Sequence, residues 1–141
     1  NDRADIALLS DADGVHLGQD DLPIAAARNV LGKDKLIGIS THNIEQALKA
    51  EQEGADYVGF GPVFETTTKT DAEEAKGITA LAEVKRRVSI PVIAIGGITL
   101  ENLREVMDAG ADGTAVISAI AKADNIEETT KRFACTVGGV K

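Results

Sequence analysis

Residues 54–61 of this 141-residue chain read GADYVGFG. The first glycine follows a stretch with apolar residues at three- and four-residue spacing, and an apolar run follows the aspartate. A glycine at such a junction suits the left-handed conformation that commonly ends a helix. The stretch therefore predicts a helix that ends near Gly54 and a strand over residues 57–61.

The same pattern occurs at two other places in the chain. Residues 110–114 read GADGT, and residues 11–15 read DADGV. Three copies at helix-to-strand junctions indicate repeated βα units, whose strands are parallel because each is followed by a crossover helix. The sequence therefore predicts an α/β fold in a single domain, residues 1–141.

Short apolar runs alternate with stretches of helical periodicity. The runs lack polar alternation, which is typical of strands buried on both faces. They cover residues 14–17, 36–40, 57–61, 91–95 and 113–118, and the predicted helices cover residues 22–31, 44–53, 78–88, 100–109 and 126–135. Cys135, in the last of these helices, is interpreted as a buried packing residue.

Two α/β architectures fit this alternation, an open doubly wound sheet and a (β/α)8 TIM barrel. Polar and glycine residues follow several predicted strands, at residues 16–21, 40–42, 61–69, 96–97 and 118. This distribution favours the barrel, whose functional groups collect at the C-terminal face of its strands. Since five units cannot close a barrel of eight, we expect the first three units to be absent from this chain.

The composition limits the classes of partner. With 43% hydrophobic and 27% charged residues, the chain can bury a core rather than remain disordered. A formal net charge of −8 makes nucleic acid a poor partner. No apolar run approaches the roughly 20 residues that cross a bilayer, and no signal segment is recognisable, so we expect no membrane partner and a cytoplasmic location.

The stretch AIGGI, residues 94–98, is a candidate phosphate site. Paired glycines such as Gly96 and Gly97 let backbone N–H groups approach an anion, and barrels commonly bind phosphate in the loops after their last strands. Ile117 and Ser118, at the end of the next predicted strand, would add amides from the other side. Taken without the neighbouring strand end, the glycine pair could be an ordinary turn that binds no phosphate.

Residues 66–69 read TTTK and form a second candidate site. Thr66 and Thr68 would point the same way in an extended loop, while Lys69 adds a positive charge, and phosphate oxygens accept from both kinds of donor. A solvated threonine-rich loop fits the same composition equally well.

One acid, Asp2, precedes the first predicted strand, and another, Asp21, follows it. Asp2 and Asp21 could share one Mg²⁺, which takes few carboxylates and completes its shell with water and phosphate oxygens. For Asp21 alone, capping of the helix that starts near Pro23 is the stronger interpretation. Together with Lys69 and the threonines, the two acids favour a metal–diphosphate site.

Neither histidine is assigned a catalytic role. His16 lies within a predicted strand and is interpreted as a packed, hydrogen-bonded core residue. His42 follows a strand at the start of a helix and could be a cap, a ligand contact or neither.

Seven stretches, in order and over nearly the whole chain, resemble the thiamine-phosphate synthase family. They are NDR (1–3), GVHLGQDDLP (14–23), IGIST (37–41), GADYVGFGPVF (54–64), TTTKTDA (66–72), IPVIAIGGI (90–98) and GADGTAVISAI (110–120). The resemblance implies a (β/α)8 barrel fold and an enzyme whose reaction requires Mg²⁺. It also implies an alkyl transfer that joins 4-amino-2-methyl-5-hydroxymethylpyrimidine diphosphate to 4-methyl-5-(2-phosphooxyethyl)thiazole, giving thiamine phosphate and diphosphate.

The resemblance also implies a role for each matching residue. Asp2 and Asp21 would bind Mg²⁺, with Asn1 near the diphosphate; Ser40 and Lys69 would contact the pyrimidine diphosphate as the catalytic pair. The thiazole phosphate would be received by Thr66, Thr68, Gly97 and the amides around Ile117 and Ser118.

Two other functions fit part of this pattern. A thiazole tautomerase on the same barrel would need the phosphate site but neither the acids nor Lys69. A non-catalytic phosphate-binding fragment would fit a chain that lacks units of its barrel. Open sheet edges would also favour self-association, or complementation by the missing N-terminal units.

Overall fold

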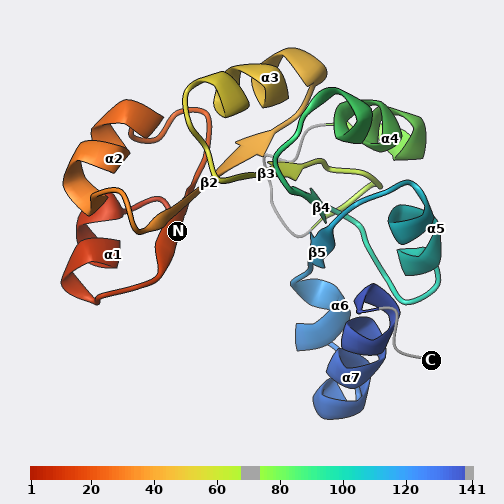
Figure 1. Ribbon diagram of the computed structural model, residues 1–141. Helices are drawn as coiled ribbons and strands as arrows, with labels where there is room; N and C mark the ends of the chain where they lie inside the picture. Colours follow the sequence, from red (N-terminus) through yellow and green to blue (C-terminus); the bar gives the residue numbers. More distant parts are fainter. Residues whose placement is uncertain (68–73, 139–141) are drawn as a thin grey trace.

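The structure is a computed structural model that describes residues 1–67 and 74–138 (Figure 1). Its centre is one parallel sheet in the order β1-β2-β3-β4-β5. The strands are β1 (Gly14–Leu17), β2 (Leu36–Thr41), β3 (Tyr57–Phe60), β4 (Val92–Ile95) and β5 (Gly113–Ala115). The helices are α1 (Ala4–Leu9), α2 (Ile24–Leu31), α3 (Ile44–Gln52), α4 (Gly77–Arg87), α5 (Leu103–Asp108), α6 (Ser118–Ala121) and α7 (Ile126–Val137).

The predicted α/β fold is confirmed, because each strand lies beside its predecessor and a helix connects the two. Four predicted strands match within one residue at each end. The fifth is shorter than predicted, ending at Ala115 rather than Ser118. The backbone of Ile117 has left the extended region (φ −114°, ψ −74°), and Ser118 begins the short helix α6, which the sequence analysis did not predict.

One face of the sheet packs on helices, and this face forms the core. The helices α2 to α5 follow the outer side of the curved sheet in Figure 1. The fully buried strand residues include Leu17, Ile37, Val58 and Val92, whereas His16, Ser40 and Tyr57 are only half-buried. The prediction that the strands are buried on both faces is therefore wrong for the described residues.

The sheet does not close within residues 1–67 and 74–138, where β1 pairs with β2 alone and β5 with β4 alone. The observed order is compatible with a barrel, and closure stays a prediction. The expected absence of three units gains no support from the structure. No helix in the described part of the chain combines the length and apolar character needed to cross a membrane.

The three repeated stretches, at residues 11–15, 54–58 and 110–114, form the same kind of helix-to-strand junction. Gly54 and Gly110 have φ values of 90° and 95° where α3 and α5 end, as predicted. In the first copy Asp11 occupies the same place with φ 52°, a conformation that aspartate tolerates better than most residues. Each junction then hydrogen-bonds to the amino end of a neighbouring strand.

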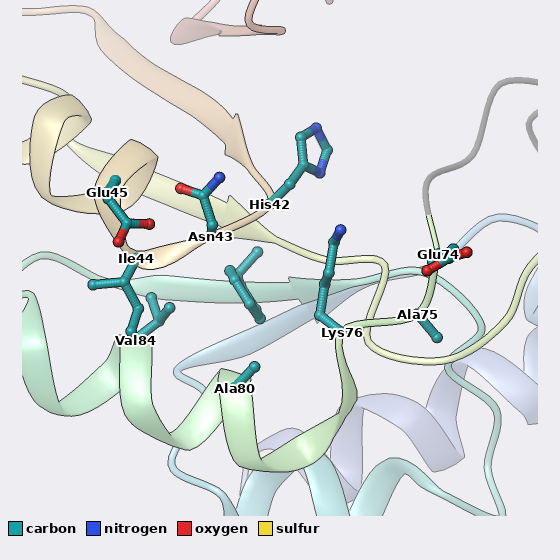
Figure 2. A pocket seen from close by; sticks show the side chains of 10 residues that line it. His42, Asn43, Ile44, Glu45, Glu74, Ala75, Lys76, Ala80 and Val84 are labelled. Carbon is teal, nitrogen blue, oxygen red and sulfur yellow. The ribbon is translucent and has the colours of Figure 1, made fainter.

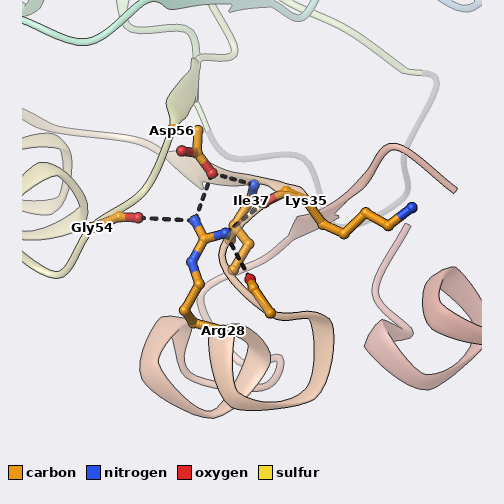
Figure 3. A network of polar contacts seen from close by, with 6 residues as sticks. Arg28, Lys35, Ile37, Gly54 and Asp56 are labelled. Atoms are coloured by element: carbon orange, nitrogen blue, oxygen red, sulfur yellow. Dashed lines mark hydrogen bonds and ion pairs between the residues drawn. The ribbon is translucent and has the colours of Figure 1, made fainter.

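The aspartates of two copies anchor these strand ends. Asp56 Oδ2 accepts from the N–H of Ile37 at 2.7 Å and from Arg28 Nη2 at 2.6 Å (Figure 3). Asp112 Oδ2 likewise accepts from the N–H of Val92 at 2.7 Å and from Lys85 Nζ at 2.6 Å. A carboxylate, a strand amide and a cation thus fix β2 and β4 against the next strand in the sheet.

Cys135 is exposed, so its interpretation as a buried residue is wrong. The residue of α7 that enters the core is Phe133, which is 5% exposed. Two positions along an α-helix turn a side chain by about 200°, so Cys135 points away from the face that Phe133 buries.

Replacing Asp56 with alanine should lower the free energy of unfolding by about 1–2 kcal/mol, because the buried strand amide of Ile37 and the Arg28 guanidinium both lose their acceptor. Chemical denaturation measures this change. The control is Lys131→Ala, which removes the exposed Lys131–Glu127 pair and should alter stability little. Equal losses in the two variants would contradict the anchoring role.

Asp112 should contribute stability that depends on pH. Partial burial acts to raise its pKa, but the hydrogen bonds from Lys85 and the Val92 amide outweigh it and hold the pKa below the ordinary 3.8. A depressed folded-state pKa stabilises the fold above the unfolded-state value, and this stability is lost as pH falls through the folded-state pKa. In denaturation series, the gap in unfolding free energy between the unsubstituted chain and Asp112→Asn should narrow below pH 3.8. A gap that is constant down to acid unfolding would refute this.

Candidate active site

The carboxyl ends of parallel strands meet at one edge of a sheet, and the predicted site residues lie at or beside these ends. Those that the structure describes are Asn1, Asp2, Asp21, Ser40, Thr66, Gly97, Ile117 and Ser118. Thr68 and Lys69 lie outside the described residues. The start of the chain, the end of β2 and the segments after β1, β3, β4 and β5 therefore supply the groups that the sequence analysis selected.

Asp2 lies beside the end of β1 in a left-handed conformation. Its N–H donates to the carbonyl of His16 at 2.9 Å, and its φ is 65°. The carbonyl of Asn1 accepts from the N–H of Arg3 at 2.8 Å, so the two residues form a tight turn before α1. Both side chains are exposed at the rim of the sheet.

Asp21 closes the loop that follows β1. Its Oδ2 accepts from the N–H of Gly18 at 2.6 Å. The helix α2 begins after Pro23, which is its N-cap without a side-chain cap bond, so the capping alternative for Asp21 is wrong. The proline already fixes the backbone angle at that position, and the carboxylate turns back towards the strand end instead.

The two acids fit a magnesium ion by the chemistry of their donors. No group of three or more His, Cys, Asp or Glu side chains converges as a metal cage within residues 1–67 and 74–138. Mg²⁺ commonly binds through one or two carboxylates and takes its other ligands from water and phosphate oxygens. Asp2 and Asp21 offer hard oxygen ligands of this kind on segments that adjoin the same strand, β1.

Ser40 is held from two sides near the end of β2. Its Oγ lies 2.9 Å from His16 Nε2, and its carbonyl accepts from Gln19 Nε2 at 2.6 Å. Gln19 belongs to the same loop as Asp21. The side chain and the backbone of Ser40 are therefore both connected to β1 and the loop after it.

His16 connects Ser40 to Tyr57 across the open face of the sheet. Its Nδ1 lies 3.0 Å from the Tyr57 hydroxyl, and the two rings are 5.5 Å apart at 33°. The hydrogen-bonded part of the His16 interpretation is confirmed, but its place in the buried core is wrong. Burial of the ring raises the pKa of the Tyr57 hydroxyl above its ordinary value of 10.0.

Two glycines make room for this contact. His16, Gly38 and Tyr57 are register partners on adjacent strands, so the tyrosine ring crosses β2 directly over Gly38. A Cβ at Gly38 would lie 2.0 Å from Tyr57 Cζ, and one at Gly59 would lie 3.0 Å from His16 Cε1. The sequence analysis missed Tyr57, although a glycine inside a strand can indicate such a close approach.

The loops after β3 and β4 are packed together. The N–H groups of Val63 and Phe64 donate to the carbonyls of Ile95 and Gly96 at 2.8 and 3.1 Å. Gly97 has φ 64°, and a Cβ there would lie 2.5 Å from the carbonyl oxygen of Glu65. This contact places Gly97 against the backbone of the residue that precedes Thr66.

Ile117 and Ser118 lie at the start of α6. Ile117 is 62% exposed, and its carbonyl accepts from the N–H of Ala121 at 2.8 Å. The segment leaves the end of β5, next to β4 in the sheet, so it adjoins the loop that contains Gly97.

His42 joins the ends of β2 and β3 and does not cap a helix through its side chain. Its Nδ1 lies 2.6 Å from the carbonyl of Gly61, while Asn43 caps α3 by accepting from the N–H of Gln46. His42 also lines a pocket of about 390 Å³ between α3 and α4 (Figure 2). This pocket was not predicted, and Glu74 and Lys76 line it with Phe60.

A parallel α/β sheet whose carboxyl-end loops gather the polar and glycine residues is typical of enzymes with a site at this edge. The family model described as "Thiamine monophosphate synthase" matches residues 1–120. The chain belongs to this family, which confirms the resemblance seen in the sequence.

Two curated relatives bear the name "Thiamine-phosphate synthase". The protein of Chloroflexus aurantiacus is 51% identical over 97% of this chain and 63% of its own length. That of Clostridium novyi is 54% identical over 95% of this chain and 66% of its own. The chain thus spans slightly less than two thirds of the curated relatives that it matches.

The fold is also found in solved structures. The thiamine phosphate pyrophosphorylase from Pyrococcus furiosus matches with a TM-score of 0.90 and 45% identity, over 99% of this chain and 66% of that one. A 3-hexulose-6-phosphate synthase matches with a TM-score of 0.72 at 20% identity, which shows a shared fold alone.

Adding a methyl group at Gly38 should displace the Tyr57 ring. Tyr57 is the only tyrosine of a chain without tryptophan, so an alkaline absorbance titration reports its pKa directly. We expect a value above 10.0 in the unsubstituted chain and a return towards 10.0 in Gly38→Ala, because the displaced ring regains water.

The matched control for this titration is Gly113→Ala, also in a strand. The new Cβ there lies 3.2 Å from the mobile end of Ile93 and should leave the Tyr57 pKa unchanged. A Gly38→Ala chain that titrates like the control would contradict the crossing of Tyr57 over β2.

Proposed function

We propose that this chain acts as a thiamine-phosphate synthase, joining a pyrimidine diphosphate to a thiazole phosphate. The observation that carries the proposal is family membership over residues 1–120, combined with candidate groups at or beside the ends of successive strands. We further propose that the five βα units form part of a (β/α)8 barrel. Its support is the sequential parallel order, with helices α2 to α5 along one side of the sheet. Cytoplasmic location stays a prediction.

The pyrimidine diphosphate would bind at the ends of β1 and β2. Asp2 and Asp21 would hold Mg²⁺, which when bound neutralises charge on the diphosphate. Ser40 would donate its hydroxyl to a diphosphate oxygen, and Lys69 would add a positive charge to the same group. Asn1 lies next to Asp2 and would contact the diphosphate with it.

The thiazole phosphate would bind at the ends of β3, β4 and β5. Hydroxyl donors from Thr66 and Thr68 would lie on one side of it. The glycine turn at Gly97 and the amides of Ile117 and Ser118 would lie on the other. Contact between the loops after β3 and β4 supports this arrangement, because it keeps the chain around Thr66 close to Gly97.

These positions fit a dissociative transfer of an alkyl group. The bond between the pyrimidine methylene and the diphosphate oxygen breaks, and its electron pair leaves with the diphosphate. The aminopyrimidine delocalises the resulting positive charge until the thiazole nitrogen donates its lone pair to form the new carbon–nitrogen bond. The chain's residues need only orient the substrates and stabilise the leaving group, so no catalytic base is required.

Replacing Lys69 with alanine should reduce synthesis of thiamine phosphate by about 10²-fold, comparable to loss of an oxyanion donor. Product formation from both substrates with Mg²⁺ measures this. Lys33→Ala, an exposed lysine that precedes β2, is the control and should retain full activity. An unchanged rate in Lys69→Ala would contradict the role of this lysine.

Binding measurements separate synthase from its alternatives. Calorimetry should show inorganic diphosphate binding that requires Mg²⁺ and weakens in Asp2→Asn, besides binding of the thiazole phosphate. Binding of thiazole phosphate alone would instead indicate a tautomerase or a non-catalytic phosphate-binding protein. Sedimentation of the same sample tests the predicted self-association.

A further inference from the structure

We propose that His16 is a positioning residue that turns the hydroxyl hydrogen of Ser40 towards an anionic ligand, with Tyr57 selecting the imidazole tautomer that does so. The identity of the anion rests on the proposed function, in which Ser40 contacts a diphosphate. The arrangement of the three side chains is independent of that function.

The three side chains form a continuous hydrogen-bonded relay. Tyr57 on β3 contacts Nδ1 of His16 at 3.0 Å, and Nε2 contacts Ser40 Oγ on β2 at 2.9 Å. Both ring nitrogens are therefore engaged by hydroxyl groups. We refer to Tyr57, His16 and Ser40 as the hydroxyl relay.

The strand register fixes the hydroxyl relay in place. His16 and Tyr57 are two strands apart, and they meet because Gly38 between them has no side chain. Gly59, the register partner of Ser40, leaves space for the imidazole. The donor from Gln19 also holds the backbone of Ser40, so the serine has little freedom to follow a ligand that is differently placed.

A neutral imidazole has one donor and one acceptor nitrogen, which permits two directions of hydrogen bonding. In one, Tyr57 donates to Nδ1 and Nε2–H donates to Ser40, whose own hydrogen then points away from the ring. In the other, Ser40 donates to Nε2, and its hydrogen is unavailable to a ligand. A tyrosine hydroxyl keeps its hydrogen at neutral pH, so Tyr57 can act as the donor of the first arrangement.

An oxyanion distinguishes between the two directions. Phosphate oxygens only accept hydrogen bonds, so they bind the arrangement in which the Ser40 hydrogen is directed outwards. A ligand shifts an equilibrium by its difference in affinity for the two states. Fixing the tautomer beforehand removes that cost, which is the function we assign to His16 and Tyr57.

The tautomer can be measured without any ligand. Nitrogen-15 NMR of the histidine side chains in the whole chain should show His16 mainly protonated at Nε2. Tyr57→Phe removes the donor to Nδ1 and should produce a mixture of tautomers, while circular dichroism confirms that the variant is folded. A His16 already protonated at Nδ1, or one unaffected by Tyr57→Phe, would overturn the relay.

A double-mutant cycle tests whether His16 acts through Ser40. With inorganic diphosphate and Mg²⁺ as the probe, Ser40→Ala and His16→Asn should each weaken binding about tenfold, within the range for a hydrogen bond to a charged group. The double variant should bind no more weakly than Ser40→Ala alone. His16→Gln, whose amide reaches near the position of Nε2, should recover most of the loss.

A structural role would give a different result. Additive losses in the cycle, or equal weakening of diphosphate and thiazole phosphate by His16→Asn, would overturn the positioning role. If the unsubstituted chain does not bind diphosphate, the proposed function and the anion assigned to Ser40 are both wrong. The NMR result would then still decide the hydroxyl relay by itself.

Discussion

The register of the parallel sheet is the constraint on which the rest of this structure depends. Because the side chains of a strand alternate between faces, a slip of one residue would exchange the face that packs on helices with the open face. The observed register buries Ile37 and Val58 and leaves His16, Ser40 and Tyr57 together on the other side. Packing and polar contacts are thus set by the same alignment.

The two ends of the sheet have different roles. At the amino ends, Asp56 and Asp112 each bind a strand amide and a cation, which fixes the alignment. At the carboxyl ends, glycines and short polar residues form loops that pack closely on one another. In (β/α)8 barrels, too, the residues that stabilise the fold lie at the amino ends of the strands and the functional residues at the carboxyl ends.

Features that depend on neighbouring residues in the sequence, such as helix ends, could be predicted. Features that depend on contacts between distant strands and helices could not. Helix ends at Gly54 and Gly110 follow from the conformational freedom of glycine, so they could be read from the sequence. A glycine inside a strand can signal a close approach, but the identity of the two side chains, His16 and Tyr57, depends on a register across three strands. Cys135 was misassigned because apolar character alone did not indicate which face of the last helix is buried.

The central proposal is that segments distant in sequence bind one metal-bound diphosphate at the carboxyl edge of the sheet. Paramagnetic broadening by Mn²⁺, added with diphosphate in place of Mg²⁺, measures this most directly through the backbone amide signals of the labelled chain. Broadening centred on the segments around Asp2, Asp21 and Ser40 is the predicted result. Broadening centred on the exposed acids Glu127 and Glu128, or spread evenly over the chain, would contradict it.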